Sequence, residues 1–301
     1  MLNIILKRYR QIPFHLMDYI ILAYILLFGI LVIPFHHDVT NWWKFPLIHF
    51  ALLLVILEFL HQVTKRKSRV FQFLRVFYPA FLLSSAWKEL DSLFTMIFPY
   101  YGNNLVIFLD KFLFGVHPTV WVEHLFTPWL TELMFFLYFS HYLLLPVFAL
   151  TIYFRKGVDS TLNLLALVCF NYALSYICFI LIPAEGAWVI LKNLHTVQPE
   201  GGFFMHLVQY IQSRGTVRGG AIPSSHVTAT FVLILAMSEQ YRKLTLWLLL
   251  LGFGIAVSTV YCRYHHAVDA ITGILFGSLF YVIGKKLLSA WQLHQSAVLK
   301  N

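Results

Sequence analysis

The chain has 301 residues, of which 59% are hydrophobic and 12% are charged, whereas an average soluble domain has roughly 25% charged residues. This composition excludes an ordinary soluble domain and indicates an integral membrane protein. The formal net charge is +9, and the order of the basic loops described below accounts for it without a nucleic-acid partner.

Eight apolar runs, each of about 17 to 25 residues, are long enough to cross a hydrocarbon core of about 30 Å as helices. They occupy residues 18–34, 46–62, 70–87, 129–153, 161–182, 223–240, 243–262 and 266–284. The first run follows a basic segment, as a signal peptide does, but the sequence after it, FHHDVTNWW, has no small-residue cleavage site. We therefore predict an all-α, polytopic membrane bundle of about eight spans with no separate soluble domain.

Basic residues are concentrated in alternate loops, as the positive-inside rule requires of cytoplasmic loops. One side has 14 lysines and arginines and the other has 7, with Arg75 left inside a span. The richer side contains Lys7, Arg8, Arg10, Lys65, Arg66, Lys67, Arg69, Arg155, Lys156, Arg242, Lys243, Lys285, Lys286 and Lys300. The poorer side contains Lys44, Lys88, Lys111, Lys192, Arg214, Arg218 and Arg263. We predict that both termini are cytoplasmic.

The segment 88–128 lies between the third and fourth runs and is rich in Phe, Trp and Tyr. Its apolar pieces are short because Pro99, Gly102, Gly115 and Pro118 interrupt them. This pattern predicts amphipathic helices in the outer interface, where aromatic side chains favour the headgroup level. The alternative is a ninth span with a re-entrant piece.

The sixth run begins with the sequence GGAIPSSHVTAT, from Gly219 to Thr230. Two glycines permit a tight backbone and Pro223 suits the first turn of a helix, so a helix is expected to start near Ser224. The first amide groups of a helix have no intrahelical acceptor, and with the helix dipole they favour an anion such as phosphate. Ser224 and Ser225 can add hydroxyl donors; alternatively, these serines only cap the helix.

A second polar segment, STVYCRYHHAVDAITG, follows at the outer end of the seventh run. His265 and Asp269 are four positions apart, so on a helix they lie on one face. A carboxylate that accepts from one imidazole nitrogen fixes the tautomer and leaves the other nitrogen as a nucleophile or base. A purely structural His–Asp pair is the alternative, but the predicted topology brings His226 and His265 to the same side of the membrane.

These two segments resemble the later motifs of the type 2 phosphatidic acid phosphatase superfamily of membrane lipid phosphatases and phosphotransferases. The matching residues are PSSH, from Pro223 to His226, and HHAVD, from His265 to Asp269. LDKFLFGVHP (109–118) and LIPAEGAW (181–188) are most similar to the inositol phosphorylceramide synthase-like branch. The superfamily's first motif, Lys-x-x-x-x-x-x-Arg-Pro, has no clear match, and Thr259 stands where the last motif usually has an arginine.

The resemblance implies a phosphohistidine mechanism without a cofactor or metal. His265 is expected to attack phosphorus, Asp269 to orient it, and His226 to protonate the leaving oxygen. Since the usual arginines are missing, the expected phosphate-binding residues are Arg263, Ser224, Ser225, Arg218 and Lys192, with Arg263 as the first choice. Water as acceptor gives a phosphatase, and an alcohol or polyol gives a transferase.

The resemblance also implies a domain organisation around a six-helix phosphatase core. We expect N-terminal transmembrane helices at 1–87, the interfacial segment at 88–128, the catalytic core at 129–286 and a cytoplasmic tail at 287–301. The substrate is expected to be a membrane lipid, with the site on the periplasmic side of a bacterial inner membrane, or the lumenal side in a eukaryote.

Two other classes of function are kept open. His226, His265, His266 and Asp269 have side chains common among zinc ligands, which allows a metal-dependent membrane hydrolase. A transporter is the other alternative, because polar residues inside spans can line a path. Those residues are Glu58, His61, Glu132, His141 and Asn171.

Overall fold

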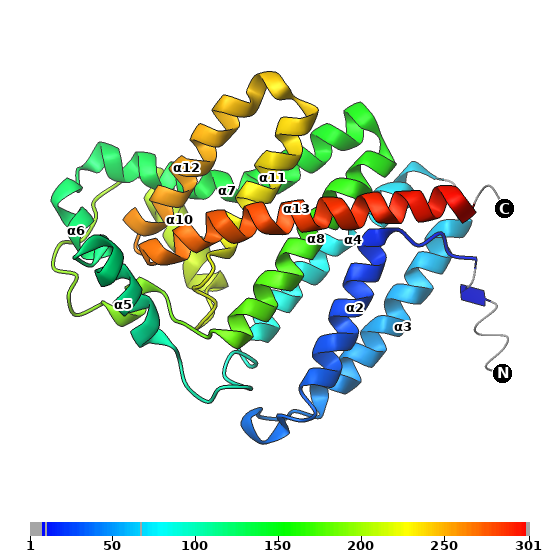
Figure 1. The fold of residues 1–301 in the computed structure, drawn as a ribbon, viewed down its shortest axis with the longest axis horizontal. Coiled ribbons are helices and arrows are strands. Elements are labelled where there is room, and N and C mark those ends of the chain that lie inside the picture. The colour runs from blue at the N-terminus through cyan, green and yellow to red at the C-terminus, as the bar shows by residue number, and fades with distance from the viewer. Residues whose placement is uncertain (1–7, 10, 67, 299–301) are drawn as a thin grey trace.

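The computed structural model describes residues 8–9, 11–66 and 68–298, and these residues contain helices and no strands (Figure 1). Eight helices correspond to the eight predicted runs. They are α2 (Leu16–Leu31), α3 (Lys44–Lys65), α4 (Arg69–Leu90), α7 (Pro128–Lys156), α8 (Val158–Leu181), α11 (Ser225–Gln240), α12 (Thr245–Tyr261) and α13 (Ala267–Val298). The predicted all-α bundle is confirmed.

The count of eight spans is not confirmed. In the part of the chain that the structure describes, five helices are long and apolar enough to cross a membrane, namely α3, α7, α8, α12 with the turn before it, and α13. α2 and α11 have 16 residues each, which is short for a span. α4 has 22 residues but carries four charged side chains, Arg69, Arg75, Lys88 and Glu89.

The aromatic segment 88–128 contains three short helices rather than one continuous span. They are α5 (Asn103–Phe114), α6 (Pro118–Trp121) and η2 (Val122–Leu125). α5 ends at Gly115, which has a left-handed φ of 71°, and the chain then bends by 65° into the second piece. This bent pair has the geometry of a broken span or a re-entrant loop, and it raises the possible number of spans to six.

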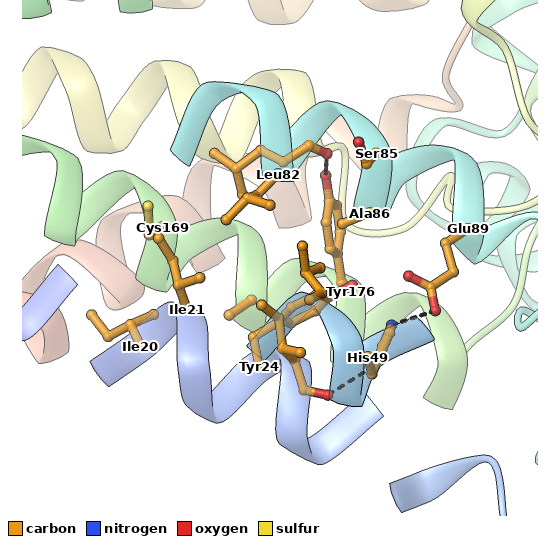
Figure 2. Close-up of a pocket in the computed structure, with 14 residues that line it drawn as sticks. Ile20, Ile21, Tyr24, His49, Leu82, Ser85, Ala86, Glu89, Cys169 and Tyr176 are labelled. Carbon is orange, nitrogen blue, oxygen red and sulfur yellow. Dashed lines mark hydrogen bonds and ion pairs between the residues drawn. The ribbon is translucent and has the colours of Figure 1, made fainter. Parts of the chain in front are cut away.

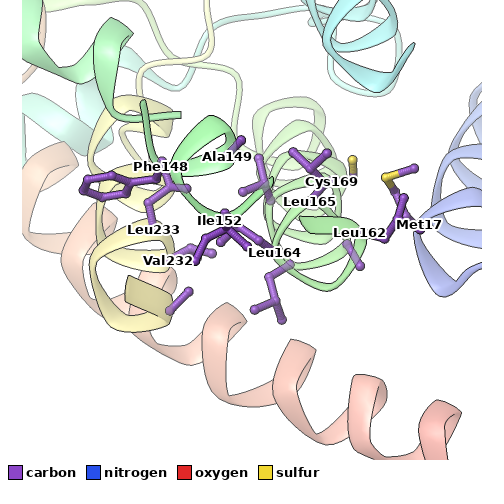
Figure 3. Close-up of a cluster of buried hydrophobic side chains, with 14 of the residues drawn as sticks. Met17, Phe148, Ala149, Ile152, Leu162, Leu164, Leu165, Cys169, Val232 and Leu233 are labelled. Carbon is purple, nitrogen blue, oxygen red and sulfur yellow. The ribbon is translucent and has the colours of Figure 1, made fainter. Parts of the chain in front are cut away.

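α8 and α11 form the centre of the bundle. α8 packs against α2, α4, α7, α11 and α13, and α11 packs against α7, α8, α12 and α13. Figure 3 shows apolar side chains of α7, α8 and α11, among them Ile152, Leu165 and Val232, meeting in one cluster, with Met17 of α2 beside α8. Large apolar side chains on the outside, such as Phe81 and Trp247, are exposed, as expected of surfaces that face lipid.

Two ionic contacts join the N-terminal helices. Arg75 of α4 donates to the fully buried Asp18 of α2, and Tyr78 donates to the same carboxylate over 2.7 Å. The arginine that lay inside a predicted span is therefore paired. Figure 2 shows the second contact, in which His49 of α3 lies 2.7 Å from the carboxylate of Glu89 and 2.8 Å from the carbonyl oxygen of Ile25.

The start of α2 and the end of α13 lie together at the basic end of the bundle. Tyr19 packs on Trp291 with ring centroids 5.3 Å apart, and Lys285 is paired with Glu239. α13 continues to Val298, so residues 287–298 of the predicted tail extend the last helix, because no helix-breaking residue follows the apolar run. Four of the basic residues assigned to this side, Lys7, Arg10, Lys67 and Lys300, lie outside the described residues, as does the end of the predicted tail at 299–301.

Candidate active site

The start of α11 is built from a tight turn, as the sequence predicts. Gly219 and Gly220 have φ values of 101° and 71°, which favour glycine. α11 begins at Ser225, with Ser224 as its N-cap residue, so the helix starts one residue later than expected. The first intrahelical bond of this turn runs from the amide of Thr228 to the carbonyl of Ser224 over 2.9 Å. The amides before Thr228 therefore have no acceptor within the helix.

His265 lies in the short connection between α12 and α13. Its Nδ1 is 3.1 Å from the carbonyl oxygen of Ala221 and 3.4 Å from Oδ2 of Asp269. Its Nε2 is 3.4 Å from Nδ1 of His226. His265 precedes the first turn of α13 rather than lying within it, but the four-residue spacing still brings Asp269 to the imidazole.

The hydrogen-bond partners assign a tautomer to His265. Because Nδ1 faces a carbonyl oxygen and a carboxylate, which only accept, Nδ1 carries the proton and Nε2 presents a lone pair. His226 continues the chain of contacts, since its Nε2 is 3.1 Å from the hydroxyl of Tyr138. The hydroxyl in turn accepts from the side-chain amide of Gln212. A hydroxyl can donate to a neutral imidazole or accept from an imidazolium, so Tyr138 fits both protonation states of His226.

Asp269 also fixes the start of α13. Its Oδ2 accepts from the amide of His266 over 2.8 Å, and its own carbonyl accepts from the amide of Ser224 over 3.0 Å. The second bond ties the two polar segments together through their backbones. Asp269 thus contacts both the imidazole of His265 and the N-cap of α11.

The neighbouring His266 has a different partner. It is fully buried, and its Nδ1 lies 3.4 Å from Oδ2 of Asp110 in α5. Asp110 also accepts from the amides of Ala267 and Val268, over 3.3 and 2.8 Å. This carboxylate therefore caps α13 from the aromatic segment, and His266 faces away from the pair formed by His226 and His265.

Small residues on α13 allow α11 and α13 to approach closely. A Cβ added at Gly277 would lie 2.7 Å from the carbonyl oxygen of Thr228, and one at Gly273 would lie 2.7 Å from Cβ of Val227. This close contact, within one helix turn of His226, keeps the backbones that carry the two histidines close together.

Both histidines line a cavity of about 640 Å³. Ser225, Tyr264 and Gln212 line the same end. Burial raises the pKa of the Tyr264 hydroxyl, so this group stays neutral beside the histidines. Ser224 is fully buried, and its hydroxyl oxygen has no hydrogen-bond partner among the described residues.

Arg263, the first-choice phosphate cation, is directed away from the histidines. Its Nη2 donates to Oε1 of Glu123 over 2.7 Å and to the carbonyl of Val197 over 2.6 Å, and its guanidinium lies over the ring of Phe126. Only 8% of the Arg263 side chain is exposed. Its backbone has a left-handed φ of 66°, so the side chain of Arg263 points toward Glu123 while that of His265 points toward His226. The two-residue spacing did not predict this difference.

The other predicted cations are at the surface. Arg218 is 70% exposed and pairs with Glu185 over 2.8 Å, and Lys192 is also exposed. Neither lines the cavity, whereas Lys88, in the last turn of α4, does. Burial lowers the pKa of the nearby His195 to about 4, and the charge of Arg263 acts in the same direction, so His195 adds no positive charge at neutral pH.

Two of the residues cited for the transporter alternative, Glu132 and His141, have partners within the protein, and the residues cited for a metal site do not form one. Among the described residues, no group of three or more His, Cys, Asp or Glu side chains is arranged to hold a metal ion. Glu132 accepts from the amides of Gly202, Phe204 and Met205 and so caps α10 (Phe203–Gly215). His141 contacts Thr230 over 3.0 Å and lies beside His226 in the cavity wall.

Comparison with known proteins identifies the family. The model of the PAP2 superfamily matches residues 105–283. The chain belongs to the PAP2 superfamily. It is thus a membrane enzyme of the type 2 phosphatidic acid phosphatase kind, a phosphoric ester hydrolase or phosphotransferase. The crystal structure of Aquifex aeolicus LpxE is similar over 60% of this chain and 94% of that one, with a TM-score of 0.43 and 16% sequence identity. No curated protein matches the chain.

Sequence reasoning missed several residues around the site, among them Lys88, Asp110 and Tyr138. Asp110 stands out as a lone carboxylate in an apolar segment, and that signal points to a buried role for it. Tyr138 and Lys88 have no such signal, because a tyrosine or a terminal lysine in an apolar helix is ordinary. Only the packing of α4 and α7 against α8 brings them to the cavity.

Proposed function

We propose that this enzyme transfers the phosphoryl group of a membrane lipid through a phosphohistidine on His265. The observation that carries the proposal is the position of His265, with Nδ1 held by Ala221 and Asp269 and Nε2 directed at His226. An imidazole oriented in this way is a nucleophile with a neighbouring acid.

In the first half-reaction the Nε2 lone pair of His265 attacks phosphorus as the bond from phosphorus to the lipid oxygen breaks. Nδ1 of His226, as imidazolium, gives its proton to that oxygen. The carboxylate of Asp269 stabilises the positive charge that develops on His265. After the transfer, His226 is neutral, and its Nε2–H group can donate a hydrogen bond to the hydroxyl of Tyr138.

In the second half-reaction water or an alcohol attacks the phosphohistidine. Neutral His226 takes the acceptor's proton, and the bond from phosphorus to Nε2 of His265 breaks. Both histidines return to their starting states, and no metal ion takes part in this scheme.

The start of α11 is the proposed phosphate-binding element. Its free amides, the unpartnered hydroxyl of Ser224 and the cavity-lining Ser225 supply donors that can hold equatorial oxygens and stabilise the transition state. Lys88 supplies a positive charge at the cavity, and Arg218 and Lys192 are proposed to act from the surface. Arg263 is proposed to hold the loops around His265 through Glu123 instead of binding phosphate.

We also propose that the enzyme belongs to the inositolphosphotransferase-like branch and uses an alcohol or polyol acceptor. The two segments that resemble this branch pack beside the candidate site, which supports the assignment. Ala221 donates to the carbonyl of Ala184 over 3.0 Å, and the amide of Val268 donates to Asp110 over 2.8 Å. An acceptor pocket formed by these loops would adjoin His265.

The proposed placement follows the charge distribution. The site faces the periplasm, or the lumen in a eukaryote, and both termini are cytoplasmic. Residues 129–286 form the catalytic core, to which 1–87 add helices and 88–128 an interfacial layer.

The test is incubation of the purified enzyme with a panel of phospholipids, with and without inositol or another alcohol. Free phosphate and new phosphodiester are measured separately, and a parallel set contains a chelator. We expect turnover that resists the chelator, and phosphodiester only when the acceptor is present. Loss of turnover with the chelator would favour the metal-dependent alternative.

A further inference from the structure

The cavity at the histidines is larger than a phosphate group requires. Its volume of about 640 Å³ lies within the range of roughly 300–1,000 Å³ that pockets for whole small molecules occupy. It also extends along the helices, since its lining includes Leu233 of α11, Leu145 of α7 and Val168 of α8.

The depth of the cavity follows from the helix rise. Leu233 lies two turns beyond His226, and Leu145 lies two turns beyond Tyr138, about 10 Å in each case. α8 runs in the opposite direction, and Val168 lies about 12 Å back from Tyr176. The lining residues on all three helices therefore show that the cavity extends from the histidines toward the middle of the bundle.

Polarity changes along this length. The end at the histidines contains the ammonium of Lys88, the amide of Gln212 and the hydroxyl of Ser225, whereas the far end is lined by Leu145, Pro146, Val168 and Leu233. An apolar compartment of this kind does not hold ordered water. Its natural occupant is hydrocarbon, joined to a polar group at the other end.

Pro146 on α7 lines the far part of the cavity and is also exposed, and Leu83 of α4 lines the cavity as well. These positions point to an outlet between α4 and α7 toward the lipid-facing surface. Deeper still, α4 and α7 meet again, because the rings of Phe73 and Phe77 pack on Tyr153 with centroids 5.7 Å apart in both pairs. The opening is thus lateral and has a closed inner end.

We propose that this cavity binds one hydrocarbon chain of the lipid that carries the phosphate, admitted sideways between α4 and α7. The inference rests on the proposed phosphoryl transfer at His265. A bilayer lipid holds its phosphate at the headgroup level with its chains perpendicular to the membrane plane, which matches the order of polar and apolar walls. Leu145 and Leu233 then set the length of chain that fits.

The first test changes the length of the cavity in both directions. Leu145→Trp should shorten it and Leu233→Ala should lengthen it. Activity is measured with one headgroup on short, medium and long chains, and with a water-soluble aryl phosphate that has no chain. We expect Leu145→Trp to lower kcat/KM for the longest chain roughly tenfold, since each excluded methylene is worth about fourfold. It should leave the aryl phosphate unchanged, while Leu233→Ala should shift the optimum to longer chains.

The matched control is Leu143→Trp, the same change at an exposed position of α7 outside the cavity lining. It should behave as the unmodified enzyme at every chain length. Equal losses for all substrates in Leu145→Trp and Leu143→Trp, or an unchanged length preference in both cavity variants, would overturn the proposal.

The second test does not require turnover. A lipid phosphate with a photoreactive group at the end of its chain is cross-linked to the unmodified protein, and the labelled residues are found by mass spectrometry. Labelling of Leu145, Val168 or Leu233 supports binding of the chain in the cavity. If the same protein turns over no phosphate ester, that result refutes the proposed function and leaves the chain-binding cavity supported. Labelling confined to exposed Leu143 and Val147 would place the chain on the outer surface and overturn the inference.

Discussion

Nε2 of His265 lies 3.4 Å from Nδ1 of His226, although the two residues are 39 positions apart. One imidazole comes from the first turn of α11 and the other from the connection before α13. The backbone bond between Ser224 and Asp269 holds the two segments at this distance. Because 3.4 Å leaves no room for phosphorus and the leaving oxygen, the two imidazoles must move apart when a phosphoryl group enters between the nucleophile and the acid.

His265→Ala should abolish turnover, because no other imidazole takes its place beside Asp269. The variant is assayed after purification in detergent, at a thermal stability matched to the unmodified enzyme. Acid-labile phosphate on the protein, measured with a radiolabelled substrate, should vanish as well. Normal turnover in this variant would remove His265 from the nucleophile's role.

His226→Ala should slow the reaction by roughly 10² to 10⁴, the usual effect of losing a general acid. A substrate whose leaving group needs no proton should recover part of that loss. The measurement compares kcat/KM on an alkyl and an aryl phosphate. Equal losses on both substrates would mean that His226 does not protonate the leaving oxygen.

The pH profile should be bell-shaped. The scheme needs one imidazole with a free lone pair and another with a proton to donate, so the rate should fall on both the acid and the alkaline side. Two coupled histidines give apparent values that belong to the pair. The profile is measured under conditions in which chemistry limits turnover, and a rate that is flat from mildly acid to alkaline pH would contradict the paired roles.

Arg263→Ala should lower the free energy of unfolding by about 1.5–3 kcal/mol, because the carboxylate of Glu123 loses its cation but keeps its hydrogen bonds from Thr196 and Val197. Glu123→Gln in the same chain should restore part of this, since it removes the unpaired charge and keeps an acceptor. Unfolding in detergent of the two single variants and the double variant gives the coupling. Unchanged stability with a raised KM in Arg263→Ala would instead indicate a direct contact with phosphate.

The predicted orientation is tested by single cysteines at exposed positions on opposite ends. Gln198→Cys lies on the side of the histidines and Lys243→Cys on the basic side. A membrane-impermeant reagent applied to intact cells should label the first and not the second, because basic loops stay in the cytoplasm. The reverse pattern would place the active site in the cytoplasm.

Most of the helices could be predicted from the sequence because apolar runs of sufficient length have few alternatives in a membrane protein. The number of spans could not, because hydropathy does not show that Asp18 neutralises Arg75 or that the 16-residue helices α2 and α11 are short for a span. The bend between α5 and α6 was equally hidden, since Gly115 marks a break but not its 65° angle.

Spacing brought the site together only in part. The four-residue spacing of His265 and Asp269 fixed a local contact, and local contacts are readable from sequence. The two-residue spacing of Arg263 and His265 suggested another, but the left-handed backbone at Arg263 directs its side chain elsewhere. Lys88 and Tyr138 reach the cavity through long-range packing, which no spacing within one segment encodes.

The ion pair between Asp18 and Arg75 makes the assembly of α2 depend on α4. A carboxylate without a partner is costly to leave in hydrocarbon, and its cation follows 57 positions later in the chain. Asp18 therefore does not meet this cation until α4 has been synthesised and has packed against α8. A charge lost from either member of the pair would be felt in the assembly of the N-terminal helices before it affects catalysis.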